Sequence, residues 1–323
     1  MAPIALPQNN ECLRGKSLLQ LGQALQERGY RFTTVTPATH LRVNSRRKNR
    51  LASDLAGVFG WSRPFKAEVL DEGLLAMLED SGAVIRDDEG YLRSAIRWSS
   101  LGKQLYLHTA FPTQAEDSVF FGPDTYRFVS AIERLLAEPH TRPIHRVADI
   151  GCGAAPAAIQ IALNCPGAEV FALDVNPLAL AYAEVNAALA RLGNLRIRHS
   201  DLLQQVDGEF DLIVANPPYM LDGEARTYRH GAGKQGEGLS VKILHEALPR
   251  LALGGRLLLY TGSAISEGHD AFLSAATQRL AATEFHWSYQ ELDPDVFGEE
   301  LDEPAYGDID RIAAVVLKVQ RTL

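Results

Sequence analysis

The spacing of apolar residues in the first part of the chain is that of amphipathic helices. Apolar side chains recur every three or four positions over three stretches, which are Ser17–Arg28, Arg47–Phe59 and Ala67–Leu78. Each stretch therefore predicts a helix. The segment Ala83–Arg93 then reads as two short strands joined by an acidic turn that ends at Gly90, which is typical of a β-hairpin.

From residue 147 onward, short segments that read as strands replace this helical spacing. They are Val147–Ile150, Glu169–Val175, Leu195–Asp201, Phe210–Ala215, Gly255–Thr261, a segment around Glu284–Leu292, and Asp310–Val319. Several of them, such as Phe210–Ala215, are largely apolar, as are strands buried on both faces in parallel sheets covered by helices. The segments therefore predict an α/β fold with a Rossmann-like sheet.

The strand that ends at Ala215 leads directly into Asn216, Pro217, Pro218 and Tyr219. Two successive prolines remove two backbone donors, so the strand ends here and its carbonyl groups point off the end of the sheet. Ligands bind at that end of an open parallel sheet. An amide, a free carbonyl and an aromatic ring form a receptor for a planar group that bears an NH₂. These four residues are the predicted catalytic motif, and a simple proline-rich turn is the alternative.

Carboxylates and glycines follow the other strands. Asp149 lies inside the first strand, before the turn that contains Gly151 and Gly153, and glycine allows a backbone to approach a ligand closely. The second strand ends in Asp174, where a carboxylate would accept hydrogen bonds from ribose hydroxyls. The third ends in Asp201, which would meet the amine of an adenine. Together they predict a site for a nucleoside-containing cofactor.

A dinucleotide is disfavoured as that cofactor. Its binding turn has the pattern G-x-G-x-x-G and places a helix start against a pyrophosphate. Here Gly153 is followed by Ala154, Ala155 and Pro156, and the carboxylate of Asp149 would repel an anion. That carboxylate suits an ammonium or a sulfonium group instead.

In these motifs the chain resembles class I S-adenosylmethionine-dependent methyltransferases, within them the Asn-Pro-Pro-Tyr group that methylates amino groups and includes the release-factor glutamine methyltransferases. The resemblance covers Phe120 to Leu323. It implies S-adenosylmethionine as the cofactor, with Asp149, Gly151 and Gly153 in the cofactor loop, Asp174 at the ribose, Asp201 beside the adenine, and Asn216, Pro217, Pro218 and Tyr219 at the target nitrogen. The family often has a third glycine where Ala155 stands.

The resemblance also implies the architecture. We expect a Rossmann-like seven-stranded methyltransferase sheet over residues 116–323, with its last two strands antiparallel. From the three predicted helices and the hairpin, we expect residues 1–115 to form a smaller amino-terminal helical, winged-helix-like domain that recognises the substrate. Between them, Asp124 and Thr125 lie in a segment that partly resembles the one that closes over the cofactor in this group, although both are also good N-cap residues for a helix.

The composition agrees with a soluble enzyme. A hydrophobic content of 46% over 323 residues provides ample core, and no apolar run is long enough to span a membrane. Met1–Asn10 has neither a basic segment nor a long apolar core, so no secretion signal is expected. Cys12, Cys152 and Cys165 lack metal-binding spacing, which predicts no metal site and reduced thiols in the cytoplasm.

The predicted activity is methyl transfer from S-adenosylmethionine to a planar amide or amine nitrogen. A protein glutamine, a nucleobase in RNA or DNA and a small amide all satisfy the motif. A macromolecular acceptor is favoured because a separate amino-terminal domain is expected where a large substrate must be held. A small-molecule N-methyltransferase is the alternative. A non-catalytic cofactor-binding module is less favoured because the strand-end acids and Asn216–Tyr219 are intact. The oligomeric state stays open.

Two charged segments bear on the acceptor in opposite ways. A basic patch, formed by Arg42, Arg46, Arg47, Lys48 and Arg50, stands out in a chain of net charge −8. It is a candidate phosphate-binding surface, or simply a solvated helix start. The acidic segment Glu291–Asp310 contains no Lys or Arg and would repel phosphates if it lay near the site.

Overall fold

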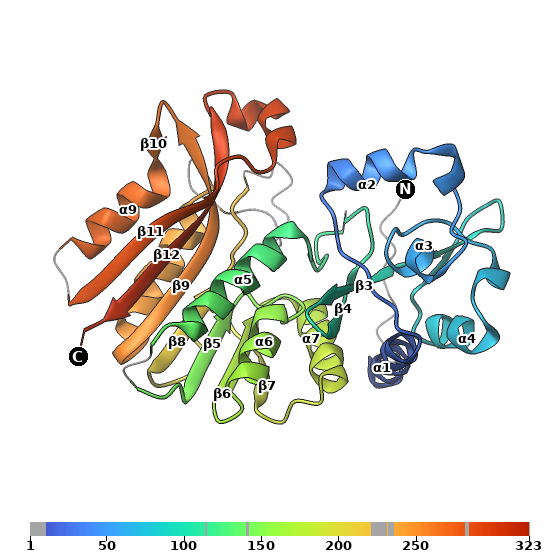
Figure 1. Cartoon of the computed structure of the whole chain (residues 1–323), viewed down its shortest axis with the longest axis horizontal. Helices are drawn as coiled ribbons and strands as arrows, with labels where there is room; N and C mark the ends of the chain where they lie inside the picture. Colours follow the sequence, from blue (N-terminus) through green and yellow to red (C-terminus); the bar gives the residue numbers. More distant parts are fainter. Residues whose placement is uncertain are drawn as a thin grey trace.

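The computed structural model describes residues 11–113, 115–139, 142–220, 231, 236–281 and 284–322; Met1–Asn10, on which the expectation about secretion rests, lies outside them. A sheet flanked by helices forms one side of the molecule, and helices with two small hairpins form the other (Figure 1). The predicted α/β fold class is confirmed. Among the described residues, no helix joins the length and apolarity that crossing a bilayer requires.

The central sheet has the strand order β11-β12-β9-β8-β5-β6-β7. Its strands are β5 (Arg146–Ile150), β6 (Glu169–Asp174), β7 (Leu195–His199), β8 (Phe210–Ala215), β9 (Leu251–Ser266), β11 (Phe285–Asp293) and β12 (Arg311–Arg321), with the short β10 (His269–Asp270) paired to β9. Strands β5 to β9 are parallel, whereas β12 and β11 run antiparallel. All seven predicted strands are present, and the last pair is antiparallel as expected.

Helices cover both faces of this sheet. One face carries α5 (Pro123–Ala137), α6 (Pro156–Asn164) and α7 (Pro177–Leu189), and the other carries α8 (Gly238–Ala247), the 3₁₀ turn η3 (Leu248–Arg250) and α9 (Ala271–Leu280). On β8, Leu212 and Val214 enter the first core, and Ile213 and Ala215 enter the second. Because side chains on both faces are buried, the strand is apolar at every position except Asp211.

The amino-terminal region consists of short elements. In order they are α1 (Glu11–Glu27), α2 (Pro37–Asn44), η1 (Arg47–Asn49), α3 (Leu55–Phe59), η2 (Ala67–Val69), α4 (Glu72–Asp80), β1 (Val84–Arg86), β2 (Leu92–Ser94), β3 (Ile96–Leu101) and β4 (Gln104–Thr109). Strands β1 and β2 pair antiparallel, which confirms the predicted hairpin. The second hairpin, β3–β4, was not predicted.

Two of the predicted helices are shorter than expected. The prediction of one helix over Arg47–Phe59 is wrong, because Asp54 accepts a hydrogen bond from the Gly57 N–H (2.6 Å) and starts α3 at Leu55. Over Ala67–Leu78, the α-helix begins only at Glu72, where the preceding Asp71 accepts from the Leu74 N–H at 2.9 Å. A capping aspartate determines where each helix starts, and the spacing of apolar residues alone does not predict that position.

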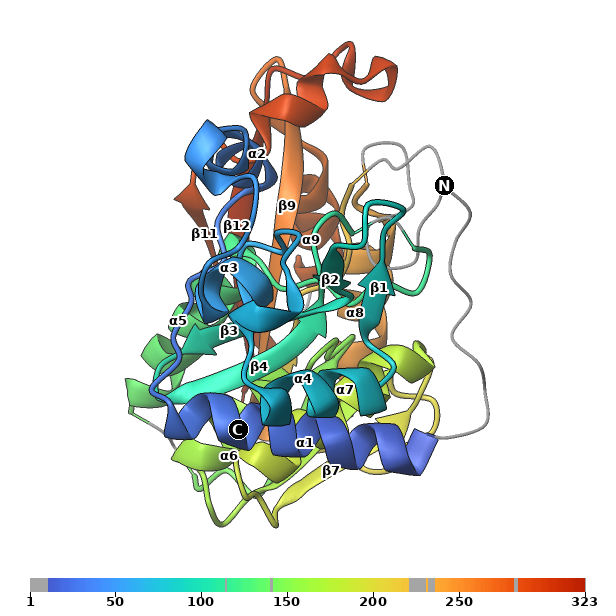
Figure 2. The ribbon, with the colours of Figure 1, turned by 90° about the vertical axis from the view of Figure 1, so that its right-hand side faces the viewer.

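The β3–β4 hairpin joins the amino-terminal region to the sheet through α7 (Figure 2). Leu105 and Leu107 of the hairpin pack into one core with Tyr182 of α7. In the same interface, Asn186 Oδ1 accepts from the Leu107 N–H (2.7 Å), and Asn186 Nδ2 donates to the carbonyl oxygens of Leu107 (3.1 Å) and Ala154 (3.0 Å). The buried Asn186 therefore ties the hairpin to α7 and to the turn after β5.

The division of the chain at residue 115 stays a proposal. Tyr106 of β4 packs into the core under α5 and α6, whereas its neighbours Leu105 and Leu107 pack into the amino-terminal core. The hairpin precedes the proposed boundary and yet contributes to the cores on both sides of it.

Replacing Asn186 with Ala should lower the free energy of unfolding by about 2–4 kcal/mol, because buried backbone donors and acceptors lose their partner. Denaturant unfolding measures the change. Asn164→Ala is the matched control, since Asn164 donates a single recorded hydrogen bond, to the Gln160 carbonyl. Equal losses in the two variants would contradict a special role of Asn186 in docking the hairpin.

Candidate active site

A cavity of about 400 Å³ lies at the carboxyl ends of the strands. The strand order reverses between β5 and β8, and open α/β sheets bind their ligands at such a reversal. All nine predicted site residues line this cavity: Asp149, Gly151, Gly153, Asp174, Asp201, Asn216, Pro217, Pro218 and Tyr219. The fold thus brings the four predicted strand ends together, while the role of each residue remains a prediction.

The turn after β5 has left-handed backbone at three alternate positions. The φ angle is 67° at Gly151, 53° at Gly153 and 59° at Ala155. A residue with a side chain is strained in this region by roughly 1–2 kcal/mol, so Ala155 holds a conformation that suits the glycine often found there in the family. A β-carbon at Gly151 or Gly153 would meet no atom within 4 Å, so open space borders the turn.

Two carboxylates border the same turn. Asp174 accepts hydrogen bonds from the backbone N–H groups of Gly153 (2.8 Å) and Asn176 (2.9 Å). Asp149 is buried and accepts from the Ala158 N–H at 3.0 Å. Burial raises the pKa of Asp149 to about 8, with a smaller contribution from the charge of Asp174, and burial raises the pKa of Asp174 as well. A cation bound beside Asp149 would stabilise its charged form.

Asp201 lies in a more open part of the cavity. Its side chain is 50% exposed, and Oδ1 is 3.6 Å from Lys242 Nζ. Leu202 and Ile243 line the cavity with it. An acceptor next to apolar side chains suits the edge of a flat ring that bears an amine, which is consistent with the role predicted for Asp201.

Asn216 and Tyr219 are held at the end of β8. The Oδ1 atom of Asn216 is buried and has no hydrogen-bond partner, a situation that costs about 1–3 kcal/mol unless a donor reaches it. The ring of Tyr219 is buried, and a β-carbon at Gly262 of β9 would collide with it. The ring of Phe297 meets it edge-on, with centroids 6.0 Å apart. The motif therefore presents a fixed ring and an unsatisfied acceptor.

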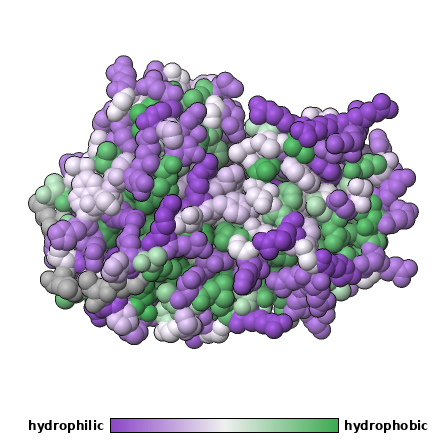
Figure 3. All heavy atoms as spheres, viewed as in Figure 1, coloured by the Kyte–Doolittle hydropathy of each residue, from purple (hydrophilic) through white to green (hydrophobic). Residues whose placement is uncertain are grey.

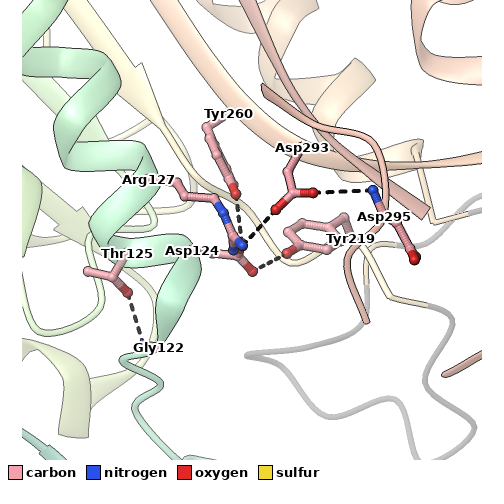
Figure 4. Close-up of polar contacts among 8 residues, drawn as sticks. All are labelled: Gly122, Asp124, Thr125, Arg127, Tyr219, Tyr260, Asp293 and Asp295. Atoms are coloured by element: carbon pink, nitrogen blue, oxygen red, sulfur yellow. Dashed lines mark hydrogen bonds and ion pairs between the residues drawn. The ribbon is translucent and has the colours of Figure 1, made fainter. Parts of the chain in front are cut away.

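The Tyr219 hydroxyl leads to a group whose role the sequence did not reveal. It donates to Asp124 Oδ2 at 2.5 Å (Figure 4). The opposite oxygen, Oδ1, accepts from the Tyr260 hydroxyl at 2.6 Å and from Arg127 Nη1 at 3.1 Å. Arg127 Nη2 in turn donates to Asp293 Oδ2 at 2.8 Å. A buried carboxylate thus connects the motif to the end of β11.

Both sequence interpretations apply to the start of α5. Thr125 caps the helix, since its Oγ1 accepts from the Gly122 N–H at 3.2 Å. Asp124 and Thr125 both line the cavity. An acid in the first turn of a helix is an ordinary feature, and its partner Tyr219 is 95 positions away, so no local signal in the sequence could have identified the contact.

The acidic segment borders the cavity. After β11 it forms η4 (Gly298–Asp302) and η5 (Pro304–Tyr306), at the same end of the molecule as α2 (Figures 1 and 2). Glu299 and Glu300 line the cavity together with Pro37 at the start of α2. The acidic segment and the amino-terminal region therefore both contribute to its wall.

The basic patch follows on from Pro37 along α2 and η1. All five of its cationic side chains are exposed, and none forms an ion pair within the described part of the chain. A hydrophilic surface covers α2 in the space-filling view (Figure 3). The patch is free to meet a charged partner on the side of α2.

Comparison with known proteins bears on this site. Residues 129–267 match the family model of the methyltransferase small domain. This stretch includes the turn after β5 and the Asn216–Tyr219 motif. Over this stretch the chain is therefore similar to the methyltransferase small domain.

Three relatives illustrate the range of similarity. The chain is 34% identical over 165 residues to the release factor glutamine methyltransferase of Deinococcus radiodurans, covering 48% of this chain and 55% of that protein. It is 37% identical over 170 residues to the protein of the same name from Bordetella pertussis, covering 49% and 61%. It is 37% identical over 97 residues to the ribosomal RNA small subunit methyltransferase C of Actinobacillus succinogenes, covering 30% and 28%. The chain therefore spans little more than half the length of the first two relatives.

The residues that line the cavity fit S-adenosylmethionine. A cationic group beside the buried carboxyl of Asp149 would stabilise its charged form, and Asp174 has lone pairs beyond those used by Gly153 and Asn176 to accept ribose hydroxyls. The open space beside Gly151 leaves room for the ligand. Within the described residues, no group of three or more His, Cys, Asp or Glu is placed to hold a metal ion.

The raised pKa of Asp149 predicts that the free energy of unfolding depends on pH. Folded Asp149 keeps its proton up to a pH of about 8, whereas the unfolded chain loses it near 3.8. Between these values the folded state binds more protons, so the free energy of unfolding should fall as pH rises. Asp149→Asn lacks this titrating group. The unfolding free energy of the variant should therefore rise relative to that of the parent between pH 4 and pH 8.

Chemical denaturation across this pH range, without ligand, measures the effect. Asp201→Asn is the control, because it removes a half-exposed carboxylate from the same cavity and should leave the pH dependence parallel to that of the parent. Parallel curves for Asp149→Asn and the parent would show that the buried carboxyl does not titrate as described.

Proposed function

We propose that the chain transfers a methyl group from S-adenosylmethionine to a planar amide or amine nitrogen of a macromolecule, with a protein glutamine as the favoured acceptor. The observation that carries this proposal is Asn216 Oδ1, a buried acceptor without a partner. It lies in the same cavity as Asp149 and Asp174. A target NH₂ would supply the missing donor.

S-adenosylmethionine supplies an activated methyl group when it is bound, so alignment and nitrogen electronics are the tasks left to the chain. The lone pair of an amide nitrogen is delocalised and weakly nucleophilic. Asn216 Oδ1 and the Pro217 carbonyl would each accept one N–H of the target, which orients its lone pair toward the cofactor side. The ring of Tyr219 would pack against the planar group and favour positive charge on the nitrogen.

A protein acceptor is favoured over nucleic acid for two reasons. The first two relatives are named for methylating a release-factor glutamine. In addition, Glu299 and Glu300 line the cavity, where their charge would repel a phosphate backbone. A nucleobase is the second candidate, supported by the relative named for ribosomal RNA and by the exposed basic patch. A small cationic metabolite is the third.

We also infer a cytoplasmic location, which Cys152 and Cys165 support as free cysteines. The amino-terminal region would recognise the acceptor, since Pro37 brings it to the wall of the cavity.

Asn216→Ala tests the proposal. We expect methyl transfer to fall by about a hundred- to a thousand-fold, the usual cost of losing one hydrogen-bond partner of the transition state. Binding of S-adenosylmethionine, measured by calorimetry, should stay close to that of the parent. The activity assay follows tritiated methyl groups from the cofactor into recombinant release factor, ribosomal RNA and free glutamine. Full activity of Asn216→Ala would remove the motif from the reaction.

The basic patch distinguishes the acceptor classes. We expect simultaneous replacement of Arg46, Arg47 and Lys48 with Ala to raise the KM for a protein acceptor modestly and to leave kcat unchanged. With a nucleic-acid acceptor, affinity would fall uniformly across sequences. The salt dependence of binding would flatten, because fewer phosphate contacts release fewer condensed counterions.

The control for this triple variant removes three exposed cations elsewhere, Lys66, Arg93 and Arg198. It should behave as the parent with either kind of macromolecule. Label that enters only free glutamine, at the same rate in the parent and both triple variants, would contradict the macromolecular proposal.

A further inference from the structure

A single buried carboxylate holds two tyrosine hydroxyls and a guanidinium beside the cavity. Asp124 is 2% exposed and comes from α5, Tyr219 follows β8, and Tyr260 belongs to β9 (Figure 4). The hydroxyl of Tyr219 reaches one carboxylate oxygen and that of Tyr260 reaches the other, at 2.5 and 2.6 Å. Burying a carboxylate is costly, so the three donors are what stabilises it there.

The two hydroxyls remain donors over the neutral pH range. Burial and the charge of Asp124 raise the pKa of both Tyr219 and Tyr260 above the usual tyrosine value. Each hydroxyl therefore keeps its proton and directs it at the carboxylate. The contacts are charge-assisted hydrogen bonds, which are roughly twice as strong as bonds between neutral groups.

Tyr219 and Tyr260 differ in what else they do. Tyr219 is the last residue of the target-nitrogen motif, and its ring lies between Gly262 and Phe297. Tyr260 packs into the core against Phe128, with ring centroids 6.0 Å apart. A bond to Asp124 thus orients a cavity-lining ring in one case and a core ring in the other.

We propose that Asp124 is a positioning residue for methyl transfer, whose carboxylate fixes the Tyr219 ring and thereby the geometry of Asn216 in the cavity. This inference rests on the proposed function. The Tyr219 ring packs against Gly262, and its hydroxyl is held by Asp124. Loss of the hydrogen bond to Asp124 would therefore allow the ring to rotate.

Arg127 extends this network to the acidic segment. It bridges Asp124 and Asp293, which ends β11 within the acidic segment, ahead of Phe297 and Glu299. Phe297 itself has left-handed backbone (φ 57°) and lies against the Tyr219 ring. The carboxylate therefore connects two walls of the cavity, the motif on one side and the acidic segment on the other.

The test compares two variants that each remove one oxygen atom. Tyr219→Phe and Tyr260→Phe each delete one hydrogen bond to Asp124, and both should lower the melting temperature slightly. We expect kcat to fall about 10- to 100-fold only in Tyr219→Phe, with the KM for S-adenosylmethionine unchanged, whereas Tyr260→Phe stays within about twofold of the parent. Asp124→Asn should lower kcat as Tyr219→Phe does, and combining the two should add little.

A second readout needs no acceptor. The side-chain NH₂ resonance of Asn216, assigned by its loss in Asn216→Ala, should shift or broaden in Tyr219→Phe and stay in place in Tyr260→Phe. This separates the inference from the proposed function, because the resonance reports on the motif even if no acceptor takes up label. An unchanged Asn216 resonance in Tyr219→Phe, or equal effects in the two tyrosine variants, would overturn the positioning role.

Discussion

The parallel pairing of β5 with its two neighbours is the constraint on which the site depends. Ile150 pairs with Ala215 of β8 and with Leu173 of β6, so the pairing of β5 with both neighbours ends at the same level. The next residue of each chain segment is Gly151, Asn216 or Asp174, and these three enter the cavity side by side. A shift of one residue in either pairing would turn Asn216 or Asp174 to the opposite face of the sheet. The register of a few apolar residues therefore determines which polar groups meet.

Negative charge dominates the chemistry that this register creates. Asp174 and Asp201 face the cavity, Glu299 and Glu300 add to its wall, and Asp149 would add a further charge with a cation bound beside it. A site of this kind attracts cationic and hydrogen-bond-donating groups and disfavours phosphates. The net charge of −8 acts in the same direction, and the basic patch on α2 is the local exception. Charge distribution thus separates a part of the surface suited to an acidic partner from a cavity suited to a cationic ligand and an amide.

The sheet could be predicted from the sequence because its central strands are buried on both faces, which leaves mostly apolar segments such as Phe210–Ala215. The strand-end residues were predictable for the same reason, since they directly follow these runs. The amino-terminal region was less predictable. Ile96–Ser99 alternates apolar and polar residues, but Arg97 and Ser99 are buried as well, so the alternation does not mark an exposed face of β3. The contact between Asp124 and Tyr219 depends on the packing of α5 against the end of β8, and only the folded chain brings the two residues together.

Asn186 gives the molecule a property that neither of its two regions has alone. Its side chain binds the β3–β4 hairpin through Leu107 and the cofactor-side turn through Ala154. A ligand that orders this turn would also favour the docked hairpin, and by thermodynamic reciprocity a partner that holds the hairpin in place would raise the affinity for that ligand by the same factor. One buried amide would therefore couple the occupancy of the cavity to the docking of the amino-terminal region.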